Sequence, residues 1–383
     1  MKIIKKFLKG LLFIILLTVI TLYIFDYEYI FKGVRVVYMT GHTTAYIDDY
    51  THFDNRTIKK GNNAISWALH EDYNKTQSTD KLNKINEELG TVAFMIIKND
   101  SIWYENYADG FGVESKTNSF SMAKSMVTAM LGKAIMDGHI KSLDQPLGDF
   151  FPEFSKAKTT VGDLSSMASG LNWTESYTSP FSITAKAYYD TNIREVLLGL
   201  EVTEEPGKEF KYLSGNTQLL GMVIEKATGE KLSDYLSKSF WKPMGMEQDA
   251  LWQLDSEDSG MEKAYCCVAS NARDFARFGI MFKNGGVFAN KQILPEEFTK
   301  LATKPRFEDG QEYGYGLWLS DHLDKKIFAM RGILGQYVIC IPEDNIIVVR
   351  LGHNRGQFLP GESFTEDFFV FIEEAYKMLE NAS

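Results

Sequence analysis

Alternating apolar and polar residues predict strands near both ends of the chain's main domain. Residues 90–110 (GTVAFMIIKNDSIWYENYADG) alternate on either side of a turn at 98–100, which predicts a two-stranded hairpin. Further strand patterns occupy 313–319, 326–332, 336–342 and 345–352, and the last two are joined by a predicted hairpin turn. We expect these distant segments to share one antiparallel sheet.

Between the two sets of strands, from residue 137 to about 290, the pattern is mainly helical. Residues 271–286 (NARDFARFGIMFKNGG) begin with Asn271 in a capping position, and an amphipathic helix is predicted at 365–380. Strands at both chain ends with helices between them indicate an α+β fold. The prediction is an antiparallel sheet built from both chain ends and flanked by helices, with an inserted helical subdomain at roughly 137–290.

The first 25 residues follow another pattern, with four lysines in the first ten residues and then an uncharged apolar run that ends at Phe25. The run is about 16 residues, or roughly 24 Å of helix, and the side chain of Lys9 can extend it toward bilayer length. No small residues suited to signal-peptide cleavage follow, although a signal peptide with an unusual site stays an alternative. We expect residues 1–25 to be an uncleaved membrane anchor with its lysines in the cytoplasm, which places the rest of the chain in the periplasm or outside the cell.

The remaining chain is predicted to consist of a stalk or linker at 26–75, partly packed on the domain, and a main domain at 76–383. A hydrophobic content of 44% over 383 residues is ordinary for a globular protein. The net charge of -10 argues against nucleic acid as a partner. Three cysteines cannot form a disulfide framework, and Cys266 and Cys267 are expected to be small buried residues rather than a bridge.

Ser121 and Lys124 stand three residues apart at the start of a long apolar helix predicted within 118–138. The S-x-x-K spacing occurs four times in the chain, but only this copy opens a helix that is apolar around most of its circumference. Lysine at this spacing reaches the serine hydroxyl, and apolar surroundings favour the neutral amine that can act as a base. On these residues alone, a capping serine with a lysine that reaches solvent stays an alternative reading.

Three motifs that follow one another in the chain resemble those of the serine β-lactamase and penicillin-binding-protein superfamily: SFSMAKS at 119–125, EEPGKEFKYLSGN at 204–216 and AMRGILGQYVICIP at 329–342. The resemblance covers roughly residues 80–375. It is closest to the 6-aminohexanoate-oligomer hydrolases and carboxylesterases related to class C β-lactamases. It implies a β-lactamase-like fold and an acyl-enzyme hydrolase that needs no metal or other cofactor.

The resemblance also assigns roles to individual residues. It makes Ser121 the nucleophile and gives the acid and base roles to Lys124 and Tyr212, without saying which of them takes the first proton. The backbone N–H groups of Ser121 and Gln336 would form the oxyanion hole. The substrate pocket is expected to include the following residues: Ser214, Ile333, Gly335, Trp173 and Tyr177.

The third motif departs from the β-lactamase pattern because Ile333 stands where those enzymes have a basic residue that holds a substrate carboxylate. The expected substrate is therefore a small-molecule or peptide-like amide or ester. Two alternatives stay open: a D-amino-acid peptidase or β-lactamase, and a catalytically silent domain that binds peptides or cell-wall fragments. The six histidines are scattered without the spacing of metal ligands.

Overall fold

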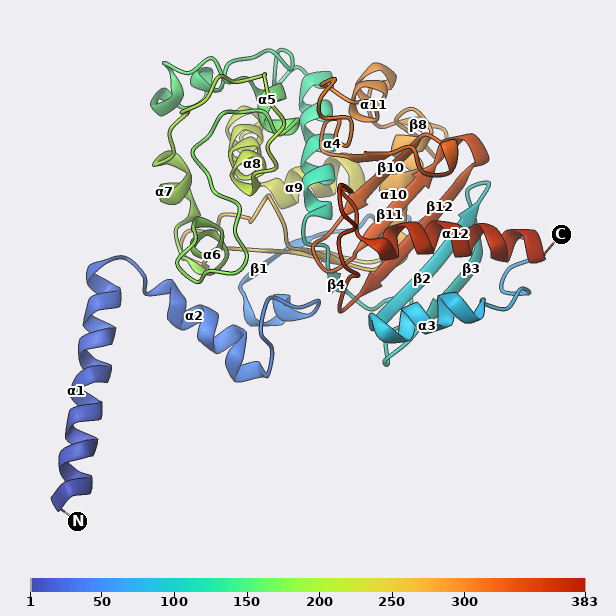
Figure 1. Ribbon diagram of the computed structural model, residues 1–383. Coiled ribbons are helices and arrows are strands. Elements are labelled where there is room, and N and C mark those ends of the chain that lie inside the picture. The colour runs from blue at the N-terminus through green and yellow to red at the C-terminus, as the bar shows by residue number, and fades with distance from the viewer. Residues whose placement is uncertain (1, 383) are drawn as a thin grey trace.

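The computed structural model describes residues 2–382 and is built around a six-stranded antiparallel sheet with the strand order β3-β2-β12-β11-β10-β9 (Figure 1). The strands of this sheet are β2 (Thr91–Lys98), β3 (Ser101–Tyr107), β9 (Trp318–Ser320), β10 (Ile327–Arg331), β11 (Tyr337–Ile341) and β12 (Ile346–Gly352). Every residue of β12 is buried, because helices cover both faces of the sheet.

Both predicted hairpins are present. Asn99 and Asp100 join β2 to β3 with φ angles of 51° and 59°, the left-handed conformation that a two-residue hairpin turn requires. Strand β12 pairs with β2, so that Val349 lies opposite Met95 and the two ends of the chain share one sheet. The predicted fold class, an antiparallel sheet from both chain ends flanked by helices, is confirmed.

Two layers of helices enclose the sheet (Figure 1). Helices α3 (Asp80–Glu88) and α12 (Glu366–Asn381) lie across one face, and α4 (Met122–Met136) and α10 (Ala272–Lys283) contact the other. As predicted, Asn271 caps the start of α10, and its side chain accepts a hydrogen bond from the Asp274 backbone N–H. Helix α4 stands between the sheet and the helical region, with most of its residues buried.

The predicted helical region, roughly 137–290, also contains strands. Its helices are α5 (Val161–Ser165), α6 (Ile183–Tyr189), α7 (Ile193–Leu198), α8 (Ser214–Thr228) and α9 (Leu232–Leu236), with a π-helix at Ser237–Trp241. Within the same region, β5 (Ala250–Gln253) and β6 (Val268–Ser270) form a second sheet with β1 (Asn55–Ile58) and β4 (Thr117–Asn118), in the order β1-β5-β6-β4. These strands have two to four residues each, too short for an alternating pattern to reveal them.

The remaining elements are small. Strands β7 (Val287–Phe288) and β8 (Lys291–Gln292) form a hairpin that leads to α11 (Glu296–Ala302). Short 3-10 helices occupy Tyr38–Thr40, Asp49–His52, Leu147–Asp149, Pro152–Phe154, His322–Asp324 and Pro342–Asp344.

The N-terminal helix α1 (Lys2–Ile24) projects away from the rest of the molecule (Figure 1). The helix has 23 residues and is long and apolar enough to cross a bilayer, a property that a signal sequence shares, and none of its residues is buried. The segment after it, predicted as a stalk, packs more closely than expected. Helix α2 (Tyr29–Val36) lies on the domain, β1 pairs with β5, and Ile47 and Ile58 are fully buried.

The two adjacent cysteines differ from the prediction. Cys266 and Cys267 form a disulfide with each other, so the expectation that they are unpaired is wrong, although both are buried as expected. A bridge between neighbours closes no loop of the chain, which is why spacing arguments about disulfide frameworks did not reveal it. Cys340 is a free, buried cysteine.

Candidate active site

Ser121 stands immediately before the first residue of α4, at the end of a tightly held turn. Phe120 precedes it with a φ of 45°, a strained left-handed conformation for a bulky residue. The turn is held because the Phe120 N–H donates to Asn118 Oδ1 at 2.9 Å and the Ser119 N–H donates to the Val268 carbonyl at 2.8 Å. Strain supported in this way is a common feature of functional sites.

The alternative reading of Ser121 and Lys124, as a capping serine and a lysine that reaches solvent, does not describe the structure. The Ser121 side chain makes no capping hydrogen bond to α4, and the Lys124 side chain is buried instead of reaching solvent. Lys124 Nζ lies 3.0 Å from Ser121 Oγ. A serine hydroxyl within hydrogen-bond distance of a buried amine is the arrangement that nucleophilic catalysis uses.

Two further oxygen atoms surround the amine of Lys124. Its Nζ lies 2.9 Å from the carbonyl oxygen of Tyr265 and 3.2 Å from Ser214 Oγ. Ser214, predicted only as a pocket residue, is therefore a direct partner of the lysine. It begins α8 and is buried.

Glu175, which the sequence analysis did not single out, holds Ser214 in place. Its carboxylate accepts the Ser214 hydroxyl at Oε1 and the Ser214 backbone N–H at Oε2, both at 2.7 Å. It also accepts the Trp173 indole N–H at 2.8 Å and the Tyr177 hydroxyl at 2.5 Å. The only sequence signal was its position between the two aromatic residues of the NWTESY segment.

Tyr177 stays protonated in this setting. Its ring is half exposed, but desolvation of its hydroxyl end and the charge of Glu175 raise the pKa of Tyr177 well above its usual value. Trp173 is buried, and its ring packs so closely on Gly215 that a Cβ there would lie 2.6 Å from the indole. Both aromatic residues thus act on Glu175.

Tyr212 lies beside Lys124 but does not bond to it. The centre of its ring is 5.0 Å from Lys124 Nζ, and among residues 2–382 its hydroxyl has no hydrogen-bond partner. The ring also contacts Trp318, with 5.0 Å between ring centres. The structure therefore brings Tyr212 next to Ser121 and Lys124, and its hydroxyl makes no hydrogen bond within the described residues.

Gln336 lies in the turn that joins β10 to β11, where Gly335 adopts a φ of 80°. The turn approaches the nucleophile, because a Cβ on Gly332 would come within 2.7 Å of the Ser119 carbonyl oxygen. The Gln336 side chain accepts from the Leu334 N–H and donates to the Gly352 carbonyl, which fixes the turn. In the described part of the chain, the backbone N–H groups of Ser121 and Gln336 donate no hydrogen bond.

A cavity of about 110 Å³ opens beside Ser121. Of the predicted pocket residues, Ser214, Tyr177 and Ile333 line it, whereas Trp173 and Gly335 do not. Its other walls are formed by Thr44, Ala45, Phe120, Ser176, Thr184, Ala185, Tyr188, Tyr189, Tyr265 and Cys266. None of these described lining residues carries a charged side chain.

A buried carboxylate from the N-terminal segment supports the nucleophile turn. Asp49 is fully buried and accepts hydrogen bonds from Asn118 Nδ2 at 2.9 Å, from the Tyr188 hydroxyl at 2.6 Å and from Gln253 Nε2 at 3.2 Å. Burial raises the pKa of Asp49, against the opposing effect of these hydrogen bonds. The expected stalk thus reaches Asn118, the residue that holds Phe120.

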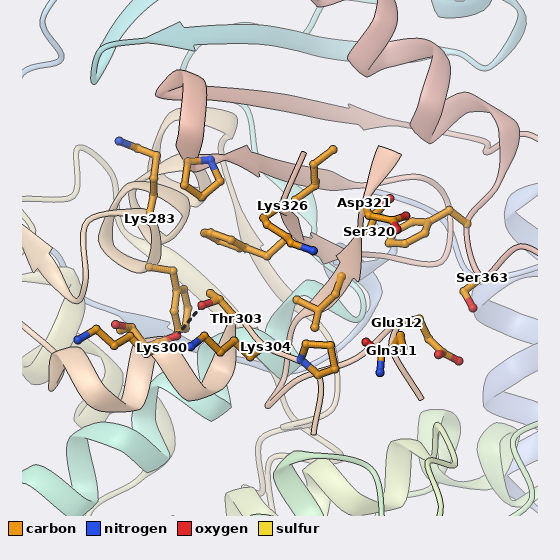
Figure 2. Close-up of a pocket in the computed structure, with 18 of the residues that line it drawn as sticks. Lys283, Lys300, Thr303, Lys304, Gln311, Glu312, Ser320, Asp321, Lys326 and Ser363 are labelled. Atoms are coloured by element: carbon orange, nitrogen blue, oxygen red, sulfur yellow. Dashed lines mark hydrogen bonds between the residues drawn. The ribbon is translucent and has the colours of Figure 1, made fainter. Parts of the chain in front are cut away.

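A larger cavity of about 920 Å³ lies elsewhere, between α10, α11 and the β9–β10 edge of the sheet (Figure 2). Lysines and carboxylates surround it, among them Lys300, Lys326 and Glu312, but none of the motif residues does. Within residues 2–382, no group of three or more His, Cys, Asp or Glu side chains is arranged to hold a metal ion. The cavity beside Ser121 is therefore the candidate active site.

Comparisons with known proteins agree with this choice. Residues 79–360 match the family model described as Beta-lactamase. The 6-aminohexanoate-dimer hydrolase of Paenarthrobacter ureafaciens is 26% identical over 292 residues, which cover 69% of this chain and 73% of that protein. The D-aminopeptidase of Brucella anthropi is 26% identical over 236 residues, covering 56% of this chain and 44% of its own length.

Solved structures share the architecture. A Bacillus anthracis protein, described as a candidate 6-aminohexanoate-dimer hydrolase, superposes with a TM-score of 0.73 and 21% identity. The superposition covers 85% of this chain and 90% of that structure. The likeness at this identity concerns the fold.

Proposed function

Since this chain belongs to the beta-lactamase family and is a serine hydrolase of the amidase or esterase type, we propose that it cleaves an amide or ester through an acyl-enzyme on Ser121. The observation that carries this proposal is the set of three oxygen atoms around Lys124 Nζ. Their hydrogen-bonding capacities decide where the lysine can act as a base.

Two of the three oxygens can only accept a hydrogen bond from Lys124. The Tyr265 carbonyl has no proton to give, and the single proton of the Ser214 hydroxyl is directed to Glu175, because a carboxylate is an acceptor only. A neutral Lys124 uses its two protons on these oxygens, and its lone pair then points toward Ser121 Oγ, 3.0 Å away. This arrangement supports Lys124 as the base that removes the Ser121 proton.

The chemical steps follow from this arrangement. Ser121 Oγ attacks the substrate carbonyl as its proton passes to Lys124, and the N–H groups of Ser121 and Gln336 receive the charge that develops on the carbonyl oxygen. The leaving amine or alcohol takes a proton from Lys124 or from the free hydroxyl of Tyr212 as its bond to the carbonyl carbon breaks. Water then attacks the acyl carbonyl and gives a proton to the group that had protonated the leaving group. The bond between the carbonyl carbon and Ser121 Oγ breaks, the acid leaves, and Ser121 Oγ takes its proton back from Lys124.

The substrate class is inferred from the cavity lining. With Ile333 in the third motif and no charge among the described lining residues, the cavity offers no cation to a substrate carboxylate. β-Lactams and peptides ending in D-alanine carry such a carboxylate. The amide named for the Paenarthrobacter ureafaciens relative supports a linear amide or an ester as the substrate.

We further propose that α1 is an uncleaved membrane anchor and that the catalytic domain faces the periplasm or the cell exterior. The lysines before the apolar run favour a cytoplasmic N-terminus. The alternative is a signal sequence, which mass spectrometry of the membrane fraction would reveal as a chain that lacks residues 1–25.

The experiment that tests the proposal compares three substrates: a short-chain p-nitrophenyl ester, a 6-aminohexanoate-type amide and a chromogenic cephalosporin. We expect turnover of the ester or the amide by the wild type and none by Ser121→Ala. A cephalosporin turned over faster than both would contradict the argument from Ile333. Binding of peptidoglycan fragments without turnover of any substrate would favour a silent domain.

A further inference from the structure

Exposed large apolar side chains outside α1 gather on one face of the molecule, close to the end of that helix. Five of them, here called the apolar collar, are Phe31, Val34, Tyr38, Met39 and Phe181, with exposed fractions from 38% to 77%. Elsewhere in the described chain such residues occur singly or as one pair, including Leu69, Met136, Leu301 and Leu323. Single exposed apolar residues are ordinary, whereas a contiguous group marks an interaction surface.

The two segments that carry the collar are packed together. The Tyr29 hydroxyl donates to the Pro180 carbonyl at 2.9 Å, and the rings of Tyr27 and Phe181 meet edge to face with 5.2 Å between centres. Helix α2 turns Tyr29, Gly33 and Val36 toward the domain, which leaves Phe31 and Val34 on its outer face. The collar is therefore one surface.

The position of the collar indicates what covers it. It starts just after Ile24, the last residue of α1, and in Figure 1 α2 leaves the end of α1 and lies on the side of the domain from which α1 projects. Aromatic and aliphatic side chains beside a membrane span are typical of the lipid–water boundary. Arg35, exposed and without an ion pair in residues 2–382, lies among them, where it can meet a lipid phosphate.

The same two segments form a wall of the active-site cavity. In the first segment, Thr44 and Ala45 follow the collar residues in sequence and line the cavity. In the second segment, Phe181 lies between cavity-lining residues on both sides in sequence, which are Ser176, Tyr177 and Tyr189. Helix α2 touches this wall directly, because a Cβ on Gly33 would lie 3.3 Å from the Tyr189 ring. The cavity and the collar are thus parts of one structural unit.

We propose that the apolar collar rests in the lipid–water boundary of the bilayer, so that the cavity beside Ser121 takes acyl esters or amides that are themselves dissolved in the membrane. This inference rests on the proposed anchor and on the proposed hydrolase activity. The occupant of the collar is the bilayer surface, because the chain that leads into the collar is the membrane-spanning helix.

Docking is tested with the full chain in phosphatidylcholine–phosphatidylglycerol vesicles. A Met39→Cys variant is labelled with an environment-sensitive fluorophore. The native cysteines do not compete for the label, because Cys266 and Cys267 are paired and Cys340 is buried. The matched control is Leu301→Cys, at an exposed apolar position of α11. We expect a blue shift and quenching by brominated lipid at position 39 and neither at position 301.

If the labels at positions 39 and 301 both emit as they do in water, the proposal is overturned. So would a label at position 39 that is shielded from water but not quenched by brominated lipid, because a second copy of the chain would then cover the collar. This readout does not depend on catalysis.

The substrate class is tested with a collar variant, Phe31→Ser with Val34→Ser and Met39→Ser, and a control, Leu301→Ser with Leu323→Ser. On a long-chain ester in the vesicles we expect the collar variant to lose about tenfold in rate relative to the control. Both should keep wild-type turnover of a soluble short-chain ester. Equal rates on the vesicle ester would overturn the proposed substrate class. Failure of the wild type on both esters and on the 6-aminohexanoate-type amide would contradict the hydrolase proposal and leave docking to be decided by the label.

Discussion

Lys124 is surrounded by three oxygen atoms, and only one of them belongs to a residue that has a proton free to give. The sequence predicted the contact between Lys124 and Ser121 because a helical spacing of three brings the side chains together. It did not predict that Glu175 bonds to Ser214 or that the Tyr265 carbonyl bonds to Lys124, since both contacts arise from the packing of separate segments. Local patterns carry no signal for such contacts.

The role of Glu175 can be tested by replacing it with glutamine. The amide can donate to Ser214 Oγ, which frees the Ser214 proton to occupy the Lys124 lone pair in place of the Ser121 proton. We expect Glu175→Gln to lower kcat by about 10²-fold, more than Ser214→Ala, in which no such competition exists. Steady-state kinetics over a range of pH measure the effect, and a Glu175→Gln enzyme as active as Ser214→Ala would argue against the proton assignment.

Asp49 gives a prediction about pH. Its raised pKa means that folding favours the protonated carboxyl, so its contribution to stability is fully present at low pH and is lost as the pH rises through the pKa of the folded state. Asparagine can keep all three hydrogen bonds by donating to the Tyr188 oxygen. We expect Asp49→Asn to gain stability over the wild type as the pH rises from about 4 to 8, in urea unfolding.

The control for this prediction is Asp49→Ala, which leaves Asn118 and Gln253 without their acceptor. Because neither variant titrates at position 49, Asp49→Ala should be about 2 kcal/mol less stable than Asp49→Asn at every pH. An Asp49→Asn protein whose stability relative to the wild type falls with rising pH would show that the carboxylate is the favoured form.

At the scale of elements, the long regular segments were predictable and the short ones were not. The hairpin of β2 and β3 follows from alternation and from Asn99 and Asp100 in the turn, and α10 from its cap. The small sheet of β1, β4, β5 and β6 depends on pairing between residues as far apart as Thr57 and Leu251. Such pairing is set by tertiary packing, to which no local pattern corresponds.

An ion pair between a buried carboxylate and a partly buried guanidinium links β3 to α10. Glu105 and Arg273 are joined by hydrogen bonds of 2.5 and 3.0 Å, and the Tyr73 and Tyr107 hydroxyls also donate to Glu105. Burial alone would raise the pKa of Glu105, but Arg273 and the tyrosines hold it below its usual value. This stabilisation is present above about pH 5 and is lost as the pH falls through the lowered pKa.

Glu105→Gln should therefore lower the free energy of unfolding by about 3 kcal/mol at neutral pH, because it leaves the Arg273 charge poorly compensated. The difference from the wild type should shrink in acid. Chemical denaturation at two pH values measures it, with Glu88→Gln in the exposed Lys84 pair as a control of little expected effect. A loss that does not depend on pH would point to packing instead of charge.

For the whole molecule, three short motifs identified the superfamily, and the match over residues 79–360 confirms that prediction. The segment before residue 79 resembles no motif, and the sequence suggested a stalk. The structure instead places β1 at the edge of the second sheet and Asp49 beneath the nucleophile turn. The folded unit thus extends well beyond the part that the family model covers.

Truncation tests this extension. A chain that starts at residue 79 loses β1 and Asp49, so we expect it to be insoluble or inactive, whereas a chain that starts at residue 26 keeps wild-type turnover of a soluble ester. Circular dichroism and ester hydrolysis provide the readouts. Full activity in the shorter chain would mean that the N-terminal segment is dispensable for the site.

The proposal that Ser121 is a nucleophile activated by Lys124 is tested most directly by labelling the full chain with a fluorophosphonate and locating the adduct by mass spectrometry. We expect a single adduct on Ser121, formed at a rate that falls by at least about 10²-fold in Lys124→Ala. An adduct on another residue, or a rate on Ser121 that is the same in Lys124→Ala, would contradict the mechanism.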